Sequence, residues 1–204
     1  SGMRIPRAIP VLLAAVVVLA ACGSAPVPLA KLNASYEQAL ARTAPLAVTL
    51  VPGSPEEQAA FARVQRYFDG MTTDSVREQT AAVYAPTAYL NDTLVGIEGA
   101  DRIAAYFGHT MQQASLLKVE FMDRAPAGTD WYVRWRMTTR AEGLNGGEDV
   151  VTWGVTQFRF DGDGRVLIHK DFWDSGTGLH EQLPGVGGIV RRVRGMVEAG
   201  AASQ

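Results

Sequence analysis

A predicted β-hairpin at residues 148–174 constrains the fold of this chain more than any other part of the sequence. Two segments rich in Val, Ile, Phe, Trp and Thr flank residues 161–164, which are alternately Asp and Gly. β-branched and aromatic residues favour strands, and Asp and Gly tolerate the positive φ angles of a tight turn. The pattern predicts two antiparallel strands joined by a short turn.

One face of this hairpin combines apolar and chemically active side chains. Successive side chains of a strand point to opposite faces, so alternate residues share a face. The residues predicted on this face are Thr156, Phe158 and Phe160 on the first strand and Leu167, His169, Asp171 and Trp173 on the second. Because charged and polar groups are uncommon in an ordinary core, we expect this face to line a cavity for a small apolar ligand. Alternatively, His169 and Asp171 only hydrogen-bond each other or the rim.

Charge and cysteine content argue against other classes of function. The net charge of −2 argues against nucleic-acid binding, which requires a basic patch. The single cysteine excludes an internal disulfide, and the three histidines match no metal-ligand spacing. The sequence therefore predicts neither a metal site nor a cofactor.

Residues 1–22 predict a signal peptide that directs the protein to the cell envelope. After two residues typical of a tag remnant, Arg4 and Arg7 precede an apolar run at 8–21, shorter than the roughly 20 residues of a membrane-spanning helix. The run ends in Leu-Ala-Ala-Cys-Gly, which resembles the lipobox of bacterial lipoproteins. We expect a lipid anchor on Cys22 and, in a Gram-negative cell, a place on the periplasmic side of the outer membrane. The alternative is an ordinary signal peptide with a chance cysteine.

The remaining residues predict a tether, one folded domain and a tail. Pro- and Ala-rich residues 23–53 are expected to be a tether with a short helix at 31–42. In the domain, 54–178, Ser54 followed by Pro and two Glu is typical of a helix start. Helical periodicity then gives way to strand alternation from residue 116 onward. This order predicts an α+β fold, with about three N-terminal helices on the concave side of a curved antiparallel sheet.

The opposite face of the hairpin is also apolar. It carries Trp153, Val155, Ile168 and Phe172. A sheet that is apolar on both faces requires a second cover. We therefore expect a homodimer that packs on this face.

The C-terminal tail, 179–204, predicts an amphipathic helix. Apolar residues recur at helical spacing between Val186 and Val197, beside Arg191, Arg192 and Arg194. Such a helix could lie on an anionic membrane surface. Alternatively, it packs on the domain or closes the mouth of the cavity.

Several short motifs together indicate a family. They are Val-Gln-Arg-Tyr-Phe at 64–68, Tyr-Ala-Pro at 84–86, Leu-Asn-Asp at 90–92, a helix opened by Gly99, and the final hairpin. In these motifs the chain resembles the ketosteroid isomerase and SnoaL-like polyketide cyclase branch of the nuclear transport factor 2-like superfamily. The resemblance covers roughly residues 54–178 and implies a cone-shaped α+β fold.

The resemblance also implies roles for individual residues. Asp92 stands where the isomerases keep their carboxylate base, and Tyr67 where they keep a phenol of the oxyanion hole. Thr156 stands in place of a protonated Asp, and its hydroxyl is a far weaker acid. The last-strand positions that line the family's pocket carry His169, Asp171 and Trp173. From the residues alone, Asp92 is as readily the cap of a turn, and Tyr67 a core tyrosine.

Two functions stay open at this point. The first is a lipid-anchored enzyme of the isomerase, cyclase or dehydratase type, in which Asp92 or the His169–Asp171 pair moves a proton at a carbon next to a carbonyl. Tyr67 would steady the oxyanion, and aromatic side chains, among them Phe158, would surround the ligand. The second is a non-catalytic ligand-binding or assembly module of the envelope.

Overall fold

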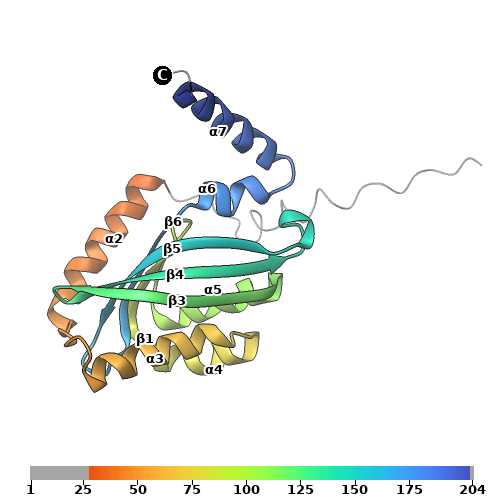
Figure 1. Ribbon diagram of the computed structural model, residues 1–204. Coiled ribbons are helices and arrows are strands. Elements are labelled where there is room, and N and C mark those ends of the chain that lie inside the picture. Colours follow the sequence, from red (N-terminus) through yellow and green to blue (C-terminus); the bar gives the residue numbers. More distant parts are fainter. Residues whose placement is uncertain (1–27, 203–204) are drawn as a thin grey trace, which may run out of the picture.

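The computed structural model describes residues 28–202, which form an α+β fold of helices followed by a six-stranded sheet (Figure 1). The helices are α2 (Leu29–Thr43), α3 (Pro55–Asp69), α4 (Thr73–Val83), α5 (Ala100–Gln113), α6 (Ser175–Gly178) and α7 (Val186–Ala202), with short 3₁₀ turns η1 (Ala44–Leu46), η2 (Asn145–Gly147) and η3 (His180–Gln182). The strands are β1 (Tyr84–Asn91), β2 (Gly96–Glu98), β3 (Ala114–Ala127), β4 (Asp130–Ala141), β5 (Val150–Phe160) and β6 (Val166–Trp173). The expected signal peptide and Cys22 lie outside the described residues.

The sheet has the strand order β2-β1-β6-β5-β4-β3, and only the β1–β6 pair is parallel. The predicted hairpin is confirmed as β5 and β6, with Thr156 opposite Asp171 and Phe158 opposite His169. Its turn is held by Asp161, whose Oδ1 accepts from the backbone N–H of Arg165 at 2.8 Å. This register places the candidate side chains of the two strands next to one another on one face.

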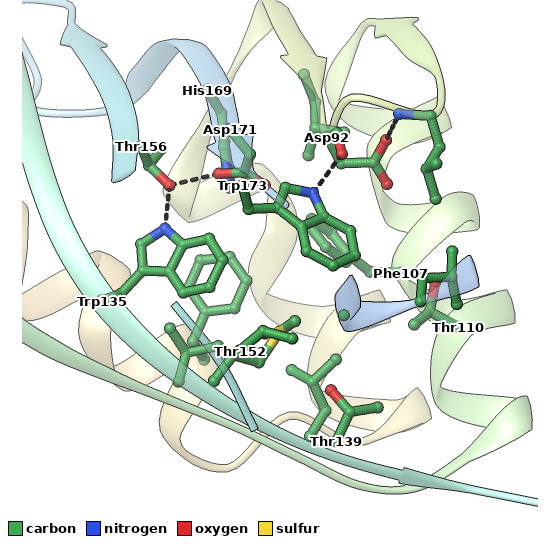
Figure 2. Close-up of a pocket in the computed structure, with 18 of the residues that line it drawn as sticks. Asp92, Phe107, Thr110, Trp135, Thr139, Thr152, Thr156, His169, Asp171 and Trp173 are labelled. Atoms are coloured by element: carbon green, nitrogen blue, oxygen red, sulfur yellow. Dashed lines mark hydrogen bonds and ion pairs between the residues drawn. The ribbon is translucent and has the colours of Figure 1, made fainter. Parts of the chain in front are cut away.

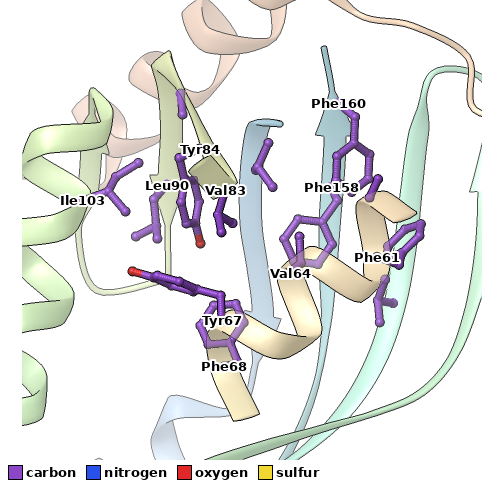
Figure 3. Close-up of a cluster of buried hydrophobic side chains, with 14 of the residues drawn as sticks. Phe61, Val64, Tyr67, Phe68, Val83, Tyr84, Leu90, Ile103, Phe158 and Phe160 are labelled. Atoms are coloured by element: carbon purple, nitrogen blue, oxygen red, sulfur yellow. The ribbon is translucent and has the colours of Figure 1, made fainter. Parts of the chain in front are cut away.

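Helices α3, α4 and α5 cover that face of the sheet, here called the inner face (Figure 1). As predicted, Ser54 caps α3, because its side chain accepts from the N–H of Glu57 at 3.1 Å. Phe61 and Val64 on α3 pack against Phe158 and Phe160 in a shared core with Ile103 of α5 (Figure 3). Burying each such side chain contributes about 2 kcal/mol. This core closes one part of the cone and leaves space between the strands and α5.

Helix α2 covers part of the opposite, outer face (Figure 1). Ala39 packs with Tyr89 of β1 and Ile168 of β6. Arg159 of β5 reaches the same helix, donating from Nη1 to the carbonyl oxygen of Leu40 at 2.8 Å. From Leu29 on, the segment expected to be a tether is therefore a packed helix that covers Ile168.

The C-terminal segment continues from β6 through α6 and η3 into α7, which extends away from the sheet (Figure 1). Asp174 caps α6, since its Oδ1 accepts from the N–H of Thr177 at 3.2 Å. None of the helices described here has both the length and the apolar character that a bilayer crossing would require.

Candidate functional site

A cavity of about 220 Å³ lies between the inner face of the sheet and helix α5 (Figure 2). Its walls are mostly apolar, and three of its aromatic residues are Phe68, Phe107 and Phe121. Its polar lining residues include His169 and Asp171 on β6, Asp92 just after β1, and Thr156 on β5. A few polar groups inside an apolar chamber are typical of a small-molecule site.

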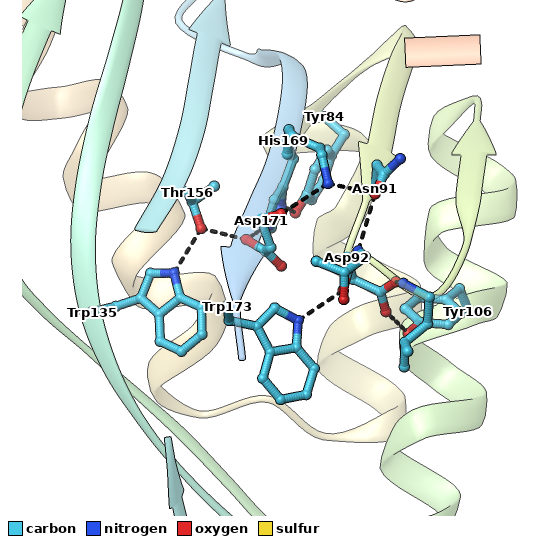
Figure 4. Close-up of polar contacts among 12 residues, drawn as sticks. Tyr84, Asn91, Asp92, Tyr106, Trp135, Thr156, His169, Asp171 and Trp173 are labelled. Atoms are coloured by element: carbon cyan, nitrogen blue, oxygen red, sulfur yellow. Dashed lines mark hydrogen bonds and ion pairs between the residues drawn. The ribbon is translucent and has the colours of Figure 1, made fainter. Parts of the chain in front are cut away.

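Asp171 is the acceptor of a hydrogen-bond chain across the strands (Figure 4). Its Oδ1 accepts from the hydroxyl of Thr156 and lies 3.0 Å from Nε2 of His169. Thr156 in turn accepts from Nε1 of Trp135 at 2.8 Å. Among the described residues, Oδ2 of Asp171 has no hydrogen-bond partner, so one carboxylate oxygen is fixed and the other is free in the cavity.

Tyr84 sets the proton arrangement of His169. The hydroxyl of Tyr84 lies 2.8 Å from Nδ1 of His169, and complete burial raises the pKa of Tyr84 well above its usual value. Tyr84 therefore keeps its proton at neutral pH and is available as a donor to Nδ1. With that donor on Nδ1, the ring proton lies on Nε2, which faces Asp171. The hydrogen-bond chain thus directs two donors, from Thr156 and His169, at Oδ1 of Asp171.

Asp92 lies at the turn after β1 and lines the same cavity. Its Oδ1 accepts from the backbone N–H groups of Leu94 and Val95, both at 3.0 Å, and its Oδ2 accepts from the hydroxyl of Tyr106. Burial raises the pKa of Asp92, and the charge of Asp171 adds to the rise, against the opposing effect of these hydrogen bonds. Burial therefore favours the protonated form of Asp92.

Two glycines shape the cavity. A Cβ built on Gly154 would meet Cζ2 of Trp135 at 2.2 Å, so the indole can lie against the strand only because residue 154 has no side chain. A Cβ on Gly178 of α6 would meet Cγ2 of Thr152 at 2.5 Å and Cζ3 of Trp173 at 2.9 Å. The α6 segment therefore closes tightly over these two cavity residues.

Comparison with known proteins identifies the domain. The sequence profile of the SnoaL-like domain family matches residues 64–169, which is more than half of the chain. The chain belongs to the SnoaL-like domain family. No curated protein matches it.

Solved structures share the fold of this SnoaL-like domain at low sequence identity. A hypothetical protein with a ketosteroid isomerase-like fold from Catenulispora acidiphila, solved with trimethylamine, is 13% identical, with a TM-score of 0.53 over 66% of this chain and 96% of that chain. An NTF2-like protein of unknown function from Burkholderia pseudomallei is 14% identical, with a TM-score of 0.53 over 65% and 100%. An LEH-like epoxide hydrolase from M. tuberculosis is 18% identical, with a TM-score of 0.51 over 69% and 99%. These likenesses show the fold alone.

The SnoaL-like domain brings together most of the residues singled out from the sequence. Those that line the cavity are Asp92, Thr156, Phe158, His169, Asp171 and Trp173. Tyr67 differs from the expectation, because its hydroxyl lies 2.7 Å from Oγ1 of Thr80 in the core and it is not part of the lining. Phe160 lies on the predicted face but outside the lining, because it packs on Phe61 of α3 in the core. Within residues 28–202, no group of three or more His, Cys, Asp or Glu could hold a metal ion.

Three residues of the site were not singled out from the sequence as functional. Tyr84 sets the His169 tautomer, Tyr106 binds Asp92, and Trp135 supports Thr156. Tyr106 lies on α5 beside Phe107, and a hydroxyl among apolar residues signals an internal hydrogen bond. Tyr84 and Trp135 gave no such signal, since their partners come from other strands of the SnoaL-like domain.

Proposed function

We propose that this SnoaL-like domain is an acid–base enzyme that removes a proton from a carbon next to a carbonyl group, with Asp171 as the base. The observation that supports this most is the asymmetry of Asp171. His169 and Thr156 hold Oδ1, while Oδ2 faces an apolar cavity without a partner among the described residues. A base needs a free oxygen in a fixed position, and this arrangement provides one.

The proposed reaction begins with transfer of the α-proton from the substrate carbon to Oδ2 of Asp171. The electron pair of the broken C–H bond moves onto the carbonyl oxygen, which becomes an enolate. Asp92, whose pKa is raised by burial, is the group that donates a hydrogen bond or proton to that oxygen. In an isomerase, the proton on Asp171 then moves to another carbon of the substrate. In a cyclase, the enolate carbon attacks a second carbonyl, and the alkoxide that forms takes the proton from Asp171.

The proposed substrate is a small, mainly apolar carbonyl compound. The cavity offers about 220 Å³ and aromatic walls that include Trp135, Phe158 and Trp173. The two carboxyl groups in its lining are those of Asp92 and Asp171, so the substrate would carry its carbonyl group at that end. The resemblance to polyketide cyclases supports the same class of substrate.

The test is deuterium exchange at α-carbons of small cyclic ketones in heavy water, followed by NMR. Asp171→Asn is expected to slow enzyme-catalysed exchange at least about 100-fold, because it removes the general base. The matched control, Asp123→Asn, changes an exposed carboxylate that pairs with Arg134 and is expected to leave the rate unchanged. Exchange catalysed equally by both variants would refute the assignment of Asp171.

Binding without catalysis is the competing outcome. Native mass spectrometry of gently purified protein would reveal a co-purifying apolar molecule in either case. If such a molecule is bound and no ketone exchanges above the solvent rate, the domain is a ligand carrier of the envelope and not an enzyme.

We also propose that the protein is anchored to the envelope by a lipid on Cys22. The apolar run at 8–21, which ends in the lipobox-like motif with the chain's only cysteine, supports this. Cells grown with a radioactive fatty acid are expected to label the protein, and Cys22→Ser is expected to remove the label. Label retained by the variant would contradict the anchor.

A further inference from the structure

Helix α7 is attached to the body through its charged side. Nη1 of Arg194 donates to Oε2 of Glu181 at 2.6 Å, and Nη1 of Arg191 donates to the carbonyl oxygen of Glu181 at 3.1 Å. Gly187 makes the approach close, since a Cβ there would lie 2.1 Å from the same carbonyl oxygen. The side chain of Glu181 is only 8% exposed and that of Arg194 is 50% exposed, so the contact that orients the helix is half-buried.

The apolar side of α7 is exposed as a continuous stripe. Residues three, four and seven positions apart share one side of a helix. The stripe consists of Val186 (46% exposed), Ile189 (67%), Val193 (57%), Met196 (69%) and Val197 (69%). These values exclude packing of the stripe on the described body, and Figure 1 shows α7 standing clear of the sheet and away from the helices of the inner face.

The charge of α7 fits an anionic surface. The helix carries Arg191, Arg192 and Arg194 against the single acid Glu198, which gives a formal charge of +2 (3 − 1). Among the described residues Arg192 makes no ion pair, and it borders the stripe on the side opposite the Glu181 contact. A helix with an aliphatic stripe between arginines binds at the boundary of acyl chains and anionic headgroups.

The position of α7 fits a membrane on the same side as the N-terminus. In Figure 1 the amino end of α2 and helix α7 lie at the same end of the molecule. Cys22 precedes Leu29, the first residue of α2, by seven positions (29 − 22), a chain that spans at most about 25 Å. The 17 residues of α7 are themselves about 25 Å long. A bilayer that holds Cys22 would therefore lie within reach of the stripe.

We propose that α7 is an interfacial helix whose apolar stripe lies on an anionic lipid bilayer. Its role goes beyond tethering, because a second contact fixes how the domain is oriented on the membrane. The cavity residues Gly178 and Leu179 belong to the segment that leads into α7, so the same contact holds that end of the cavity towards the lipid.

The test places an environment-sensitive NBD dye at single sites on α7 in the full chain. Cys22→Ser removes the only native cysteine, and Val193→Cys or Glu198→Cys then places the dye on the stripe or on the polar side. With vesicles of phosphatidylcholine and phosphatidylglycerol, the dye at 193 is expected to shift to the blue and to be quenched by nitroxide-labelled lipid. The dye at 198 is expected to stay in water.

A charge variant tests the electrostatic part. Arg192→Gln is expected to weaken the contact about fivefold, because one arginine near an anionic surface is lost. Arg77→Gln makes the same change on the exposed side of α4, where Arg77 pairs with Asp74, and is expected to have no effect. Near-UV circular dichroism verifies that each variant keeps its folded body.

Three results would overturn the proposal. The dye at 193 could remain in water with anionic vesicles, or it could shift equally with vesicles of phosphatidylcholine alone. It could also shift without vesicles in proportion to protein concentration, which would identify a second copy of the chain as the partner. Because Cys22 is replaced throughout, none of these results depends on lipidation, which fatty-acid labelling tests separately.

Discussion

Asp92 and Asp171 show how position decides what a carboxylate can do. Asp92 sits in a turn and spends both oxygens on its surroundings, two backbone N–H groups and the hydroxyl of Tyr106. Asp171 sits within a strand whose backbone bonds are made by the sheet, so only one of its oxygens is used. Burial raises the pKa of Asp92 against these hydrogen bonds and suits it to hold a proton, whereas Asp171 keeps one oxygen free to accept one.

A pH-dependent stability effect follows at Asp92. Because burial raises its pKa in the fold, the folded state loses stability as pH rises from the unfolded value of about 4 through the folded pKa. Asp92→Asn keeps an acceptor for the turn and removes the charge. We predict that it increases the free energy of unfolding more at neutral pH than at acid pH, as measured by urea denaturation. A change of equal size at every pH would contradict this.

The sequence located the site residues on β5 and β6 through one physical rule. Alternation along two strands is enough to place Thr156 beside His169, Asp171 and Trp173, because a hairpin turn sets the register. The rule also places Phe160 on this face, but it cannot show that Phe61 of α3 packs on that ring and keeps it out of the cavity. Tyr67 could not be placed either, since its hydroxyl meets Thr80 only through the packing of α3 on α4.

The turn between β1 and β2 carries strain at Thr93. Its φ of 79° lies in the left-handed region, and its Oγ1 is buried without a hydrogen-bond partner among the described residues. We predict that Thr93→Gly raises the free energy of unfolding by about 1 kcal/mol. The control, Thr87→Gly in β1, is expected to lower it by about 0.5–1 kcal/mol, because that residue is in a strand. Chemical denaturation of both variants tests this; a loss of stability at position 93 would refute the strain.

A buried ion pair between β5 and β4 holds the arginine that also binds α2. Nε of Arg159 lies 2.6 Å from Oδ1 of Asp130, and the two side chains are 9% and 15% exposed. We predict that Arg159→Met destabilises the fold by about 3 kcal/mol, because Asp130 is left buried and unpaired. The exposed pair of Arg134 and Asp123 is the control, and Arg134→Met is expected to cost under about 1 kcal/mol. Urea denaturation measures both; equal losses would show that burial of the pair is unimportant.

This contact also explains why the packing of α2 was not foreseen. The helix itself was predicted at 31–42, because its local sequence suffices for that. Its docking depends on Arg159, more than 100 residues later, and on a hydroxyl of Tyr36 that donates to Gln157. No local pattern signals a contact of that range, so the segment looked like a tether.

At the scale of the whole molecule, α2 leaves part of the outer face uncovered. Trp153 is 52% exposed and Phe172 46% exposed, while Ile168 is buried under α2. We propose that a second copy covers the uncovered part, and we predict a dimer in sedimentation equilibrium at micromolar concentration. Trp153→Lys is expected to yield monomers, and Arg77→Gln on α4 is the control. A monomeric wild-type protein would refute the dimer.

The contact between Gly154 and Trp135 has a consequence for how such domains diverge. The indole of Trp135 forms part of the cavity wall, yet it packs against the backbone of Gly154, which a ligand need not contact. Adding a single methyl group at that position would push the ring inward and shrink the room left for a guest. In the proposed ligand site, the size of the compounds that fit would therefore depend on Gly154, which contacts Trp135 and not the ligand.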